Sequence, residues 1–150
     1  MSDDVVARLG TILDTTEMRE VRAQHAAEAV RAARGYRWVG IYDVGDTEIE
    51  IVGHTGVQAP AFVRFSVDHG LSGEAVRTRE TVVCNDVSSD SRYITAFEST
   101  GSETIVPILG AETGIVIGTL DVESDRVDAF TDEDRRFLEA CAQALMPLFE

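Results

Sequence analysis

Residues 114–124 read "GIVIGTLDVES", and this apolar stretch ending in two acids decides the architecture of the chain. Because the side chains of a β-strand alternate between two faces, the stretch predicts a strand whose acids share one face. One predicted face holds Ile115, Ile117, Thr119, Asp121 and Glu123, and the other holds Val116, Leu120 and Val122. Two carboxylates on one face of an apolar strand either point to solvent or form the floor of a binding site.

Further strands and helices flank this stretch. Strand patterns occupy 37–44, 48–54, 61–67, 81–87 and 102–109, and the segments "GDT" and "GAETG" predict hairpins. In the first of these strands Trp38, Gly40 and Tyr42 share one face, and Val39 and Ile41 share the other. Helical spacing of apolar residues predicts helices from an aspartate cap (Asp3 or Asp4) to about Leu13, from about Thr16 to Ala33, and after Thr131.

The helix ends carry their own signals. Gly35 is placed to end the second helix, and Thr131 with Asp134 approximates a capping box at the start of the last one. The last helix has an apolar stripe of Phe137, Cys141, Ala144, Leu145 and Leu148. Two shorter helices are predicted inside the strand region, one in 70–80 with Ser72 as its cap and one capped by Ser89 or Asp90.

This order predicts the α+β class: an antiparallel sheet of about six strands, with the terminal helices on one face and the loops and short helices on the other. No repeat, low-complexity segment or linker interrupts the 150 residues. We therefore expect a single domain over 1–150, with a helical extension at 1–15 and a core at 16–149.

The charge of the chain excludes several kinds of partner. The formal net charge is −14, which disfavours nucleic acid and anionic membranes because both require a cationic surface. All thirteen basic residues are arginine. Two explanations stay open: a high-GC genome encodes arginine more readily than lysine, and a salt-loving organism favours acidic surfaces. No stretch reaches the roughly 18 apolar residues of a membrane span, and no leader is visible, so we expect a cytoplasmic location.

The potential metal ligands are scattered. Two cysteines, Cys84 and Cys141, form no CxxC pair, and the three histidines lie far apart. This spacing predicts neither a metal site nor a cofactor. His54 and His69 fall in loop-like segments, where we expect them to be solvated.

Several segments taken together resemble the GAF domain family, whose members bind small ligands in many signalling proteins. They are "GLSGEAVRTRETVVCNDVSSDSRY", "SETIVPIL", "GIVIGTLDVES" and "FTDEDRRFLEACAQAL", and the resemblance covers about 16–149. Within the family, "WVGIY", "AFVRFSVDHGLSGEAV" and "IGTLDVES" look most like the single-domain free methionine-R-sulfoxide reductases. The resemblance implies a GAF-like sheet with a ligand pocket under the loops and short helices.

The resemblance also implies what the pocket lacks. In those reductases a thiolate attacks the sulfoxide sulfur, and a second thiol resolves the sulfenic acid as a disulfide. The family's cysteine positions correspond here to Phe62, Ser72 and Ala96. A serine hydroxyl cannot pass through these oxidation states, which leaves Cys84 as the candidate thiol. We interpret Cys84 and Cys141 as small buried apolar residues.

The acidic side of the family's pocket is retained. Its pocket acids correspond to Glu103, Asp121 and Glu123, which would bind a cation or an ammonium group. We expect Trp38 and Tyr42 to be pocket walls able to hold an ammonium group by cation–π contact, and Phe62 to fill space near them. Alternatively these aromatic rings belong to the ordinary core. Ser72 and the neighbouring amides would bind a ligand carboxylate.

Three hypotheses stay open from the sequence. The first is a sensory or regulatory binding module for an amine-bearing, amino-acid-like ligand, without reductase activity and dimeric through its terminal helices. The second is a divergent methionine sulfoxide reductase that uses Cys84 with an external thiol. The third is a module without a ligand that dimerises and contacts a signalling protein.

Overall fold

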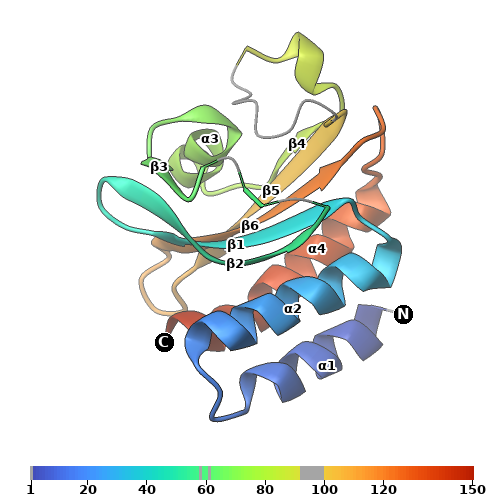
Figure 1. Ribbon diagram of the computed structural model, residues 1–150. Coiled ribbons are helices and arrows are strands. Elements are labelled where there is room, and N and C mark those ends of the chain that lie inside the picture. The colour runs from blue at the N-terminus through green and yellow to red at the C-terminus, as the bar shows by residue number, and fades with distance from the viewer. Residues whose placement is uncertain (1, 58, 61, 92–99) are drawn as a thin grey trace.

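The computed structural model describes residues 2–57, 59–60, 62–91 and 100–150, and its centre is a six-stranded antiparallel sheet (Figure 1). In chain order the strands are β1 (Trp38–Val44), β2 (Glu48–Gly56), β3 (Arg64–Ser66), β4 (Val82–Cys84), β5 (Ser102–Leu109) and β6 (Val116–Ser124). Their order across the sheet is β3-β2-β1-β6-β5-β4, so β6, which carries the two acids, lies in the middle.

Helices cover one face of this sheet. They are α1 (Ser2–Leu13), α2 (Arg19–Arg34) and α4 (Asp132–Ala144), which continues into the 3-10 helix η2 (Met146–Phe149). Helix α3 (Gly70–Thr78) and the 3-10 helix η1 (Val87–Ser89) belong to the chain between β3 and β5, and α3 lies over the opposite face (Figure 1). The α+β fold predicted from the order of elements is confirmed. No helix among the described residues is long and apolar enough to cross a membrane.

The main core lies between the sheet and the three long helices. Val39 and Ile41 of β1 pack there with Leu120 and Val122 of β6, as the alternation of both strands predicts. Residues of all three helices and the C-cap residue of α4 complete this core, among them Leu9, Leu13, Ala26, Val30, Phe137, Leu138, Cys141 and Leu145. Helix α1 therefore contributes buried residues to the same core as the rest of the chain.

One part of the predicted alternation is wrong. The register between β5 and β6 shifts where Ile108 faces Gly118 and Leu109 faces Val116, so Ile117 is an extra residue on β6. Such a bulge changes the face on which the preceding side chains lie. Ile117 accordingly packs against the helix-side core and does not share a face with Asp121.

The ends of the two best-marked helices agree with the sequence. Gly35 ends α2 in the left-handed conformation (φ 66°), and its N–H donates to the carbonyl of Arg31. At α4 the backbone N–H of Asp134 donates to the Thr131 hydroxyl over 3.2 Å, and the N–H of Thr131 donates back to the Asp134 carboxylate over 3.0 Å. The predicted capping box is confirmed.

Other predicted caps are wrong. Helix α1 already includes Asp3 and Asp4, and α2 begins at Arg19, three residues after Thr16. Ser72 is the third residue of α3, whose N-cap position is His69. The turn η1 is capped by Asp86, whose carboxylate accepts from the Ser88 N–H. The helix expected to begin after Ser89 or Asp90 would continue into 92–99, so this cap stays a prediction. The segment that follows, with Ala96, lies outside the described residues.

Candidate functional site

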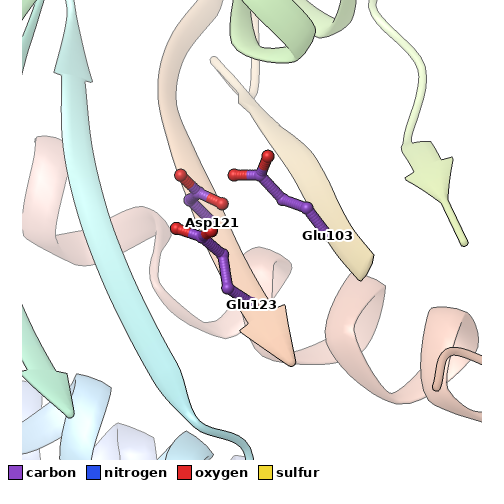
Figure 2. A group of neighbouring side chains, drawn as sticks. All are labelled: Glu103, Asp121 and Glu123. Carbon is purple, nitrogen blue, oxygen red and sulfur yellow. The ribbon is translucent and has the colours of Figure 1, made fainter. Parts of the chain in front are cut away.

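Three acids lie side by side on the sheet face opposite the long helices. Glu103 of β5 is directly opposite Glu123 of β6. Asp121 lies two residues before Glu123 on the same strand and therefore on the same face. Figure 2 shows the three carboxyl groups gathered above these two strands, with Glu103 reaching towards Asp121. One oxygen from each lies within 4.8 Å of the others, and the side chains are almost fully buried, with at most 6% exposed.

Glu103, Asp121 and Glu123 form an acidic cluster. Their burial and their short mutual distances change the pKa values of Glu103 and Asp121. Burial, the charges of the other two acids and a hydrogen bond with Asp121 raise the pKa of Glu103 well above its usual value. Burial also raises the pKa of Asp121 to about 6, although its hydrogen bond with Glu103 acts in the opposite direction. The raised pKa of Glu103 favours its protonated form, in which it can donate a hydrogen bond to the Asp121 carboxylate.

The other oxygens of the acidic cluster differ in their partners. The hydroxyl of Thr100 donates to Glu123 Oε1 over 2.8 Å. In contrast, Asp121 Oδ1 is buried without a hydrogen-bond partner among the described residues. A buried acceptor left unpaired costs free energy, so an unpaired carboxylate oxygen on a residue that lines a pocket indicates a place for a donor.

Aromatic rings from β1 stand beside the acids. Across the β1–β6 register, Gly40 is opposite Asp121 and Trp38 is opposite Glu123. The rings of Trp38 and Tyr42 lean over Gly40, with centroids 6.4 Å apart, and a Cβ on Gly40 would lie only 2.3 Å from the Trp38 ring. Only glycine at this position lets both rings lie against the acidic floor.

A pocket of small volume lies above this floor. The centre of a water molecule can occupy about 40 Å³ of it, and the empty space including the mouth is about 460 Å³. It is lined by the three acids and by Trp38, Tyr42, Pro60, Phe62, Phe65, His69, Gly70, Leu71, Ser72 and Ile105. Every ligand-binding residue that we selected from the sequence therefore contributes to this one cavity, including Phe62, which is 43% exposed at the pocket.

Helix α3 begins at the pocket. Gly70, Leu71 and Ser72 form its first turn and line the cavity. The first amides of a helix have no partner within the helix, and the N-cap residue His69 makes no side-chain hydrogen bond to them. The helix therefore presents N–H groups and the positive end of its dipole. Ser72 lies inside this turn, with its side chain 95% buried, and does not cap it.

The two thiols lie apart from this arrangement. Cys84 is buried in a small cluster with Leu71, Ala75 and Val87, and it does not line the pocket, although it is opposite Glu103 in the sheet register. Cys141 lies in the helix-side core on the other face, where burial raises the pKa of its thiol to about 12. No direct exchange between the two thiols is possible across the sheet.

Sequence reasoning missed several contributors to the pocket. The ring of Phe65 meets the Tyr42 ring edge-on, with centroids 5.8 Å apart. In the sequence, only its position in a short predicted strand distinguished this residue. Of the two histidines expected to be solvated, His69 is exposed and also lines the cavity. His54 is half-buried and stacks on Trp38. Thr100, the donor to Glu123, carried no signal, because its role depends on the packing of the segment before β5.

Comparisons with known proteins agree with the fold. The family model for the GAF domain matches residues 15–148. The chain is 32% identical over 111 residues to GAF domain-containing protein A of Dictyostelium discoideum, a match that covers 73% of this chain and 68% of that protein. It is 29% identical over 111 residues to the free methionine-R-sulfoxide reductase of Saccharomyces cerevisiae, covering 72% of this chain and 60% of the enzyme.

A solved structure is similar over almost the whole chain. It is the X-ray structure of free methionine-R-sulfoxide reductase from Neisseria meningitidis in complex with its substrate, with a TM-score of 0.87 and 26% identity. The alignment covers 99% of this chain and 87% of that one. The relationship to these reductases, which the sequence motifs predicted, is confirmed.

Proposed function

The chain belongs to the GAF domain family, and from that premise we propose that it is a sensory or regulatory module that binds a small amine-bearing, amino-acid-like molecule in its acidic pocket. The family fold is a ligand-binding regulatory one. The observation that carries the proposal is the unpaired Oδ1 of Asp121, which is buried and belongs to a cluster of three close carboxyl groups. Such a group attracts a cation that can also donate a hydrogen bond.

The pocket offers a complementary group for each end of a zwitterion. The ammonium group would lie on the acidic cluster, between the rings of Trp38 and Tyr42, whose faces attract cations. The carboxylate would accept hydrogen bonds from the amides at the start of α3 and from the Ser72 hydroxyl. A ligand held at both ends is recognised by its backbone, and its side chain is selected by the apolar wall, which includes Phe62 and Leu71.

The names of the relatives raise reductase chemistry as an alternative. The resemblance places the family's cysteines at the positions of Phe62, Ser72 and Ala96, where this chain has none. Cys84 is packed behind α3 with Leu71 and Ala75. A sulfoxide in the pocket would therefore meet aromatic carbon and a hydroxyl. One observation favours the alternative: Cys84 is opposite Glu103 in the sheet, so a shift of α3 would expose its thiol beside an acid.

Binding can be followed by the fluorescence of the protein. The chain has one tryptophan, and Trp38 lines the pocket, so its emission reports occupancy directly. We expect titration with a panel of free amino acids and their N-methylated derivatives to change this emission saturably, with matching heats in calorimetry. In Asp121→Asn the affinity should fall at least tenfold, because a charge-assisted hydrogen bond is lost.

The control for this variant is Asp46→Asn, which removes the same charge from the exposed β1–β2 turn. It should bind as the wild type does. Absence of any saturable response across the panel would contradict the proposed ligand class.

Two further measurements separate the alternatives. Turnover of free methionine-R-sulfoxide with a thiol reductant, lost in Cys84→Ser but kept in Cys141→Ser, would establish the reductase. A stable dimer without ligand response or turnover would favour a purely structural module. Dimerisation through α1, α2 and α4 is part of our proposal, and equilibrium sedimentation tests it.

A further inference from the structure

We propose that Phe62 selects the amino acid bound in this pocket, and that it favours a large uncharged side chain, such as that of methionine, over the sulfoxide on which the similar reductases act. The inference rests on the proposed function, in which the acidic cluster holds the ammonium group and α3 faces the carboxylate. It names the class of side chain that completes the ligand. The supporting observations are the lining of the cavity, the exposure of Phe62 and the residue that the reductases have in its place.

Above the acidic floor the cavity is lined mainly by carbon. Its apolar residues come from the β2–β3 connection, β3, α3 and β5, and they are Pro60, Phe62, Phe65, Leu71 and Ile105. Their side chains neither donate nor accept hydrogen bonds. Among the described residues no arginine lines the cavity, and the chain has no lysine. An anionic side chain of a ligand would therefore lie near three acids without an arginine or lysine partner.

The polar lining outside the floor lies at one place, the start of α3. His69, Gly70 and Ser72 line the cavity there, where the proposed carboxylate would be bound. The other two lining residues, Trp38 and Tyr42, belong to β1 beside the acids. An amino acid bound by its ammonium and carboxylate groups in this way presents its side chain to the apolar part of the lining.

Phe62 lies at the open end of the cavity. It is 43% exposed, whereas the three acids are at most 6% exposed and form the deep end. A ligand whose ammonium group lies at the deep end therefore needs a long side chain to reach this ring. Covering an exposed aromatic ring with apolar atoms removes both surfaces from water, which favours binding in proportion to the area covered. The position of Phe62 thus favours large apolar side chains over small ones.

The residue itself distinguishes this chain from the reductases. The resemblance places one of their cysteines at the position of Phe62, where a phenyl ring can neither attack a sulfoxide nor donate a hydrogen bond to its oxygen. Burying that oxygen against the ring without a hydrogen bond costs free energy. The thioether of methionine, in contrast, makes favourable contacts with aromatic rings. The pocket therefore suits the reduced amino acid better than its sulfoxide.

The test is a ligand series that changes only the side chain. Alanine, methionine, methionine-R-sulfoxide and glutamate share the ammonium and carboxylate groups, and their binding is measured by Trp38 fluorescence and calorimetry. We expect methionine to bind at least about tenfold more tightly than alanine, because it transfers the apolar surface of about two more methylene groups. It should also bind at least about tenfold more tightly than its sulfoxide, whose oxygen would be buried unpaired. Glutamate should bind most weakly.

Two variants assign the selection to Phe62. Phe62→Ala removes the ring and leaves the acids and α3 in place, so the ratio of the methionine affinity to the alanine affinity should fall at least about threefold. The ratio of the methionine affinity to the sulfoxide affinity should fall with it. The control is Ile115→Ala, which shortens another exposed apolar side chain, 56% exposed in the β5–β6 connection and not part of the cavity lining. It should leave both ratios unchanged.

The outcomes separate this inference from the function on which it rests. Tightest binding by methionine, with both ratios reduced in Phe62→Ala, supports it. Equal or tighter binding of alanine, the sulfoxide or glutamate overturns the inference and leaves the amine-binding function intact. Ratios that do not change in Phe62→Ala overturn the role of this residue. No binding of any amino acid overturns both the inference and the proposed function.

Discussion

Asp121 and Glu103 share a proton in a place where neither carboxylate meets bulk water. Two acids of ordinary strength would both be ionised at neutral pH, but burial and mutual repulsion raise the pKa of Glu103 and favour its protonated form. The pair therefore behaves as one negative charge with an internal hydrogen bond. Burying these acids costs the folded protein free energy. Such a cost is typical of a binding site and not of a residue that stabilises the fold.

Replacing the charged partner should stabilise the unliganded protein. Asp121→Asn removes a buried charge whose pKa is raised from 3.8 to about 6, a shift that corresponds to a destabilisation of up to about 3 kcal/mol at neutral pH. We expect a gain of about 1–3 kcal/mol in the free energy of unfolding, measured by urea denaturation. The exposed Asp46→Asn should change it by less than about 0.5 kcal/mol. A loss of stability in Asp121→Asn would contradict the assigned charge state.

The same raised pKa fixes a direction for the pH dependence. Between about pH 4 and pH 6 the folded protein holds a proton on Asp121 that the unfolded chain has released. This contribution to stability is complete below the unfolded pKa and is lost as the pH rises through about 6. Melting curves should therefore show the wild type losing stability over this window relative to Asp121→Asn. A difference that does not vary over the window would count against it.

At the scale of elements, the faces of β1 and of the second half of β6 were predicted correctly because alternation is a local property. Trp38 and Tyr42 share the pocket face with Asp121 and Glu123, since residues an even number of positions apart in a strand point to the same face. The bulge at Ile117 was not predictable, because it depends on how β5 ends. The cap of α3 was misplaced by three residues, since the helix starts where the chain from β3 reaches the sheet, which is a tertiary constraint.

Gly40 tests the geometry of β1. A methyl group there would lie 2.3 Å from the Trp38 ring and 2.9 Å from the Tyr42 ring. We expect Gly40→Ala to push both rings from the floor, costing about 1–3 kcal/mol of stability and shifting the emission of Trp38. Gly10→Ala on α1, where a Cβ has open space, is the matched control. Unchanged emission in Gly40→Ala would show that the rings do not need this glycine.

The capping box of α4 is the element whose sequence signal was most complete. Thr131→Ala removes the hydroxyl that accepts the Asp134 N–H and itself donates to that carboxylate. We expect a loss of about 1 kcal/mol in the free energy of unfolding, with ligand affinity unchanged because α4 lies on the other face. Thr131→Ser keeps the hydroxyl and should restore most of the stability. A change in affinity that accompanied the lost cap would link α4 to the pocket.

At the scale of the whole molecule, charge dominates. A net charge of −14 on 150 residues repels itself in the compact state, and added salt screens this repulsion. We expect the melting temperature to rise by about 3–6 °C between 0.05 and 0.5 M salt, for about 1–2 kcal/mol of screened repulsion. Equal ionic strengths of NaCl and KCl should give the same rise. A rise with one salt alone would indicate a specific cation site.

The fold and the acidic floor could be predicted from the sequence, whereas the shape and size of the pocket could not. Periodicity and the resemblance to GAF domains gave the sheet, the helix side and the three acids. The roof depends on where the first turn of α3 and the ring of Phe65 settle above the floor, which no local pattern encodes. The partner of Glu123, Thr100, shows the same limit, because its hydroxyl reaches the acid only in the folded chain.

The most direct test of the central claim is a crystal structure of the protein equilibrated with a mixture of free amino acids and their N-methylated derivatives. We predict density for one bound molecule whose nitrogen lies about 2.7–3.0 Å from Asp121 Oδ1, between the Trp38 and Tyr42 rings. Its carboxylate should face the first turn of α3. Density only for water above the acidic cluster at saturating ligand, or a molecule whose nitrogen points away from Asp121, would contradict the account.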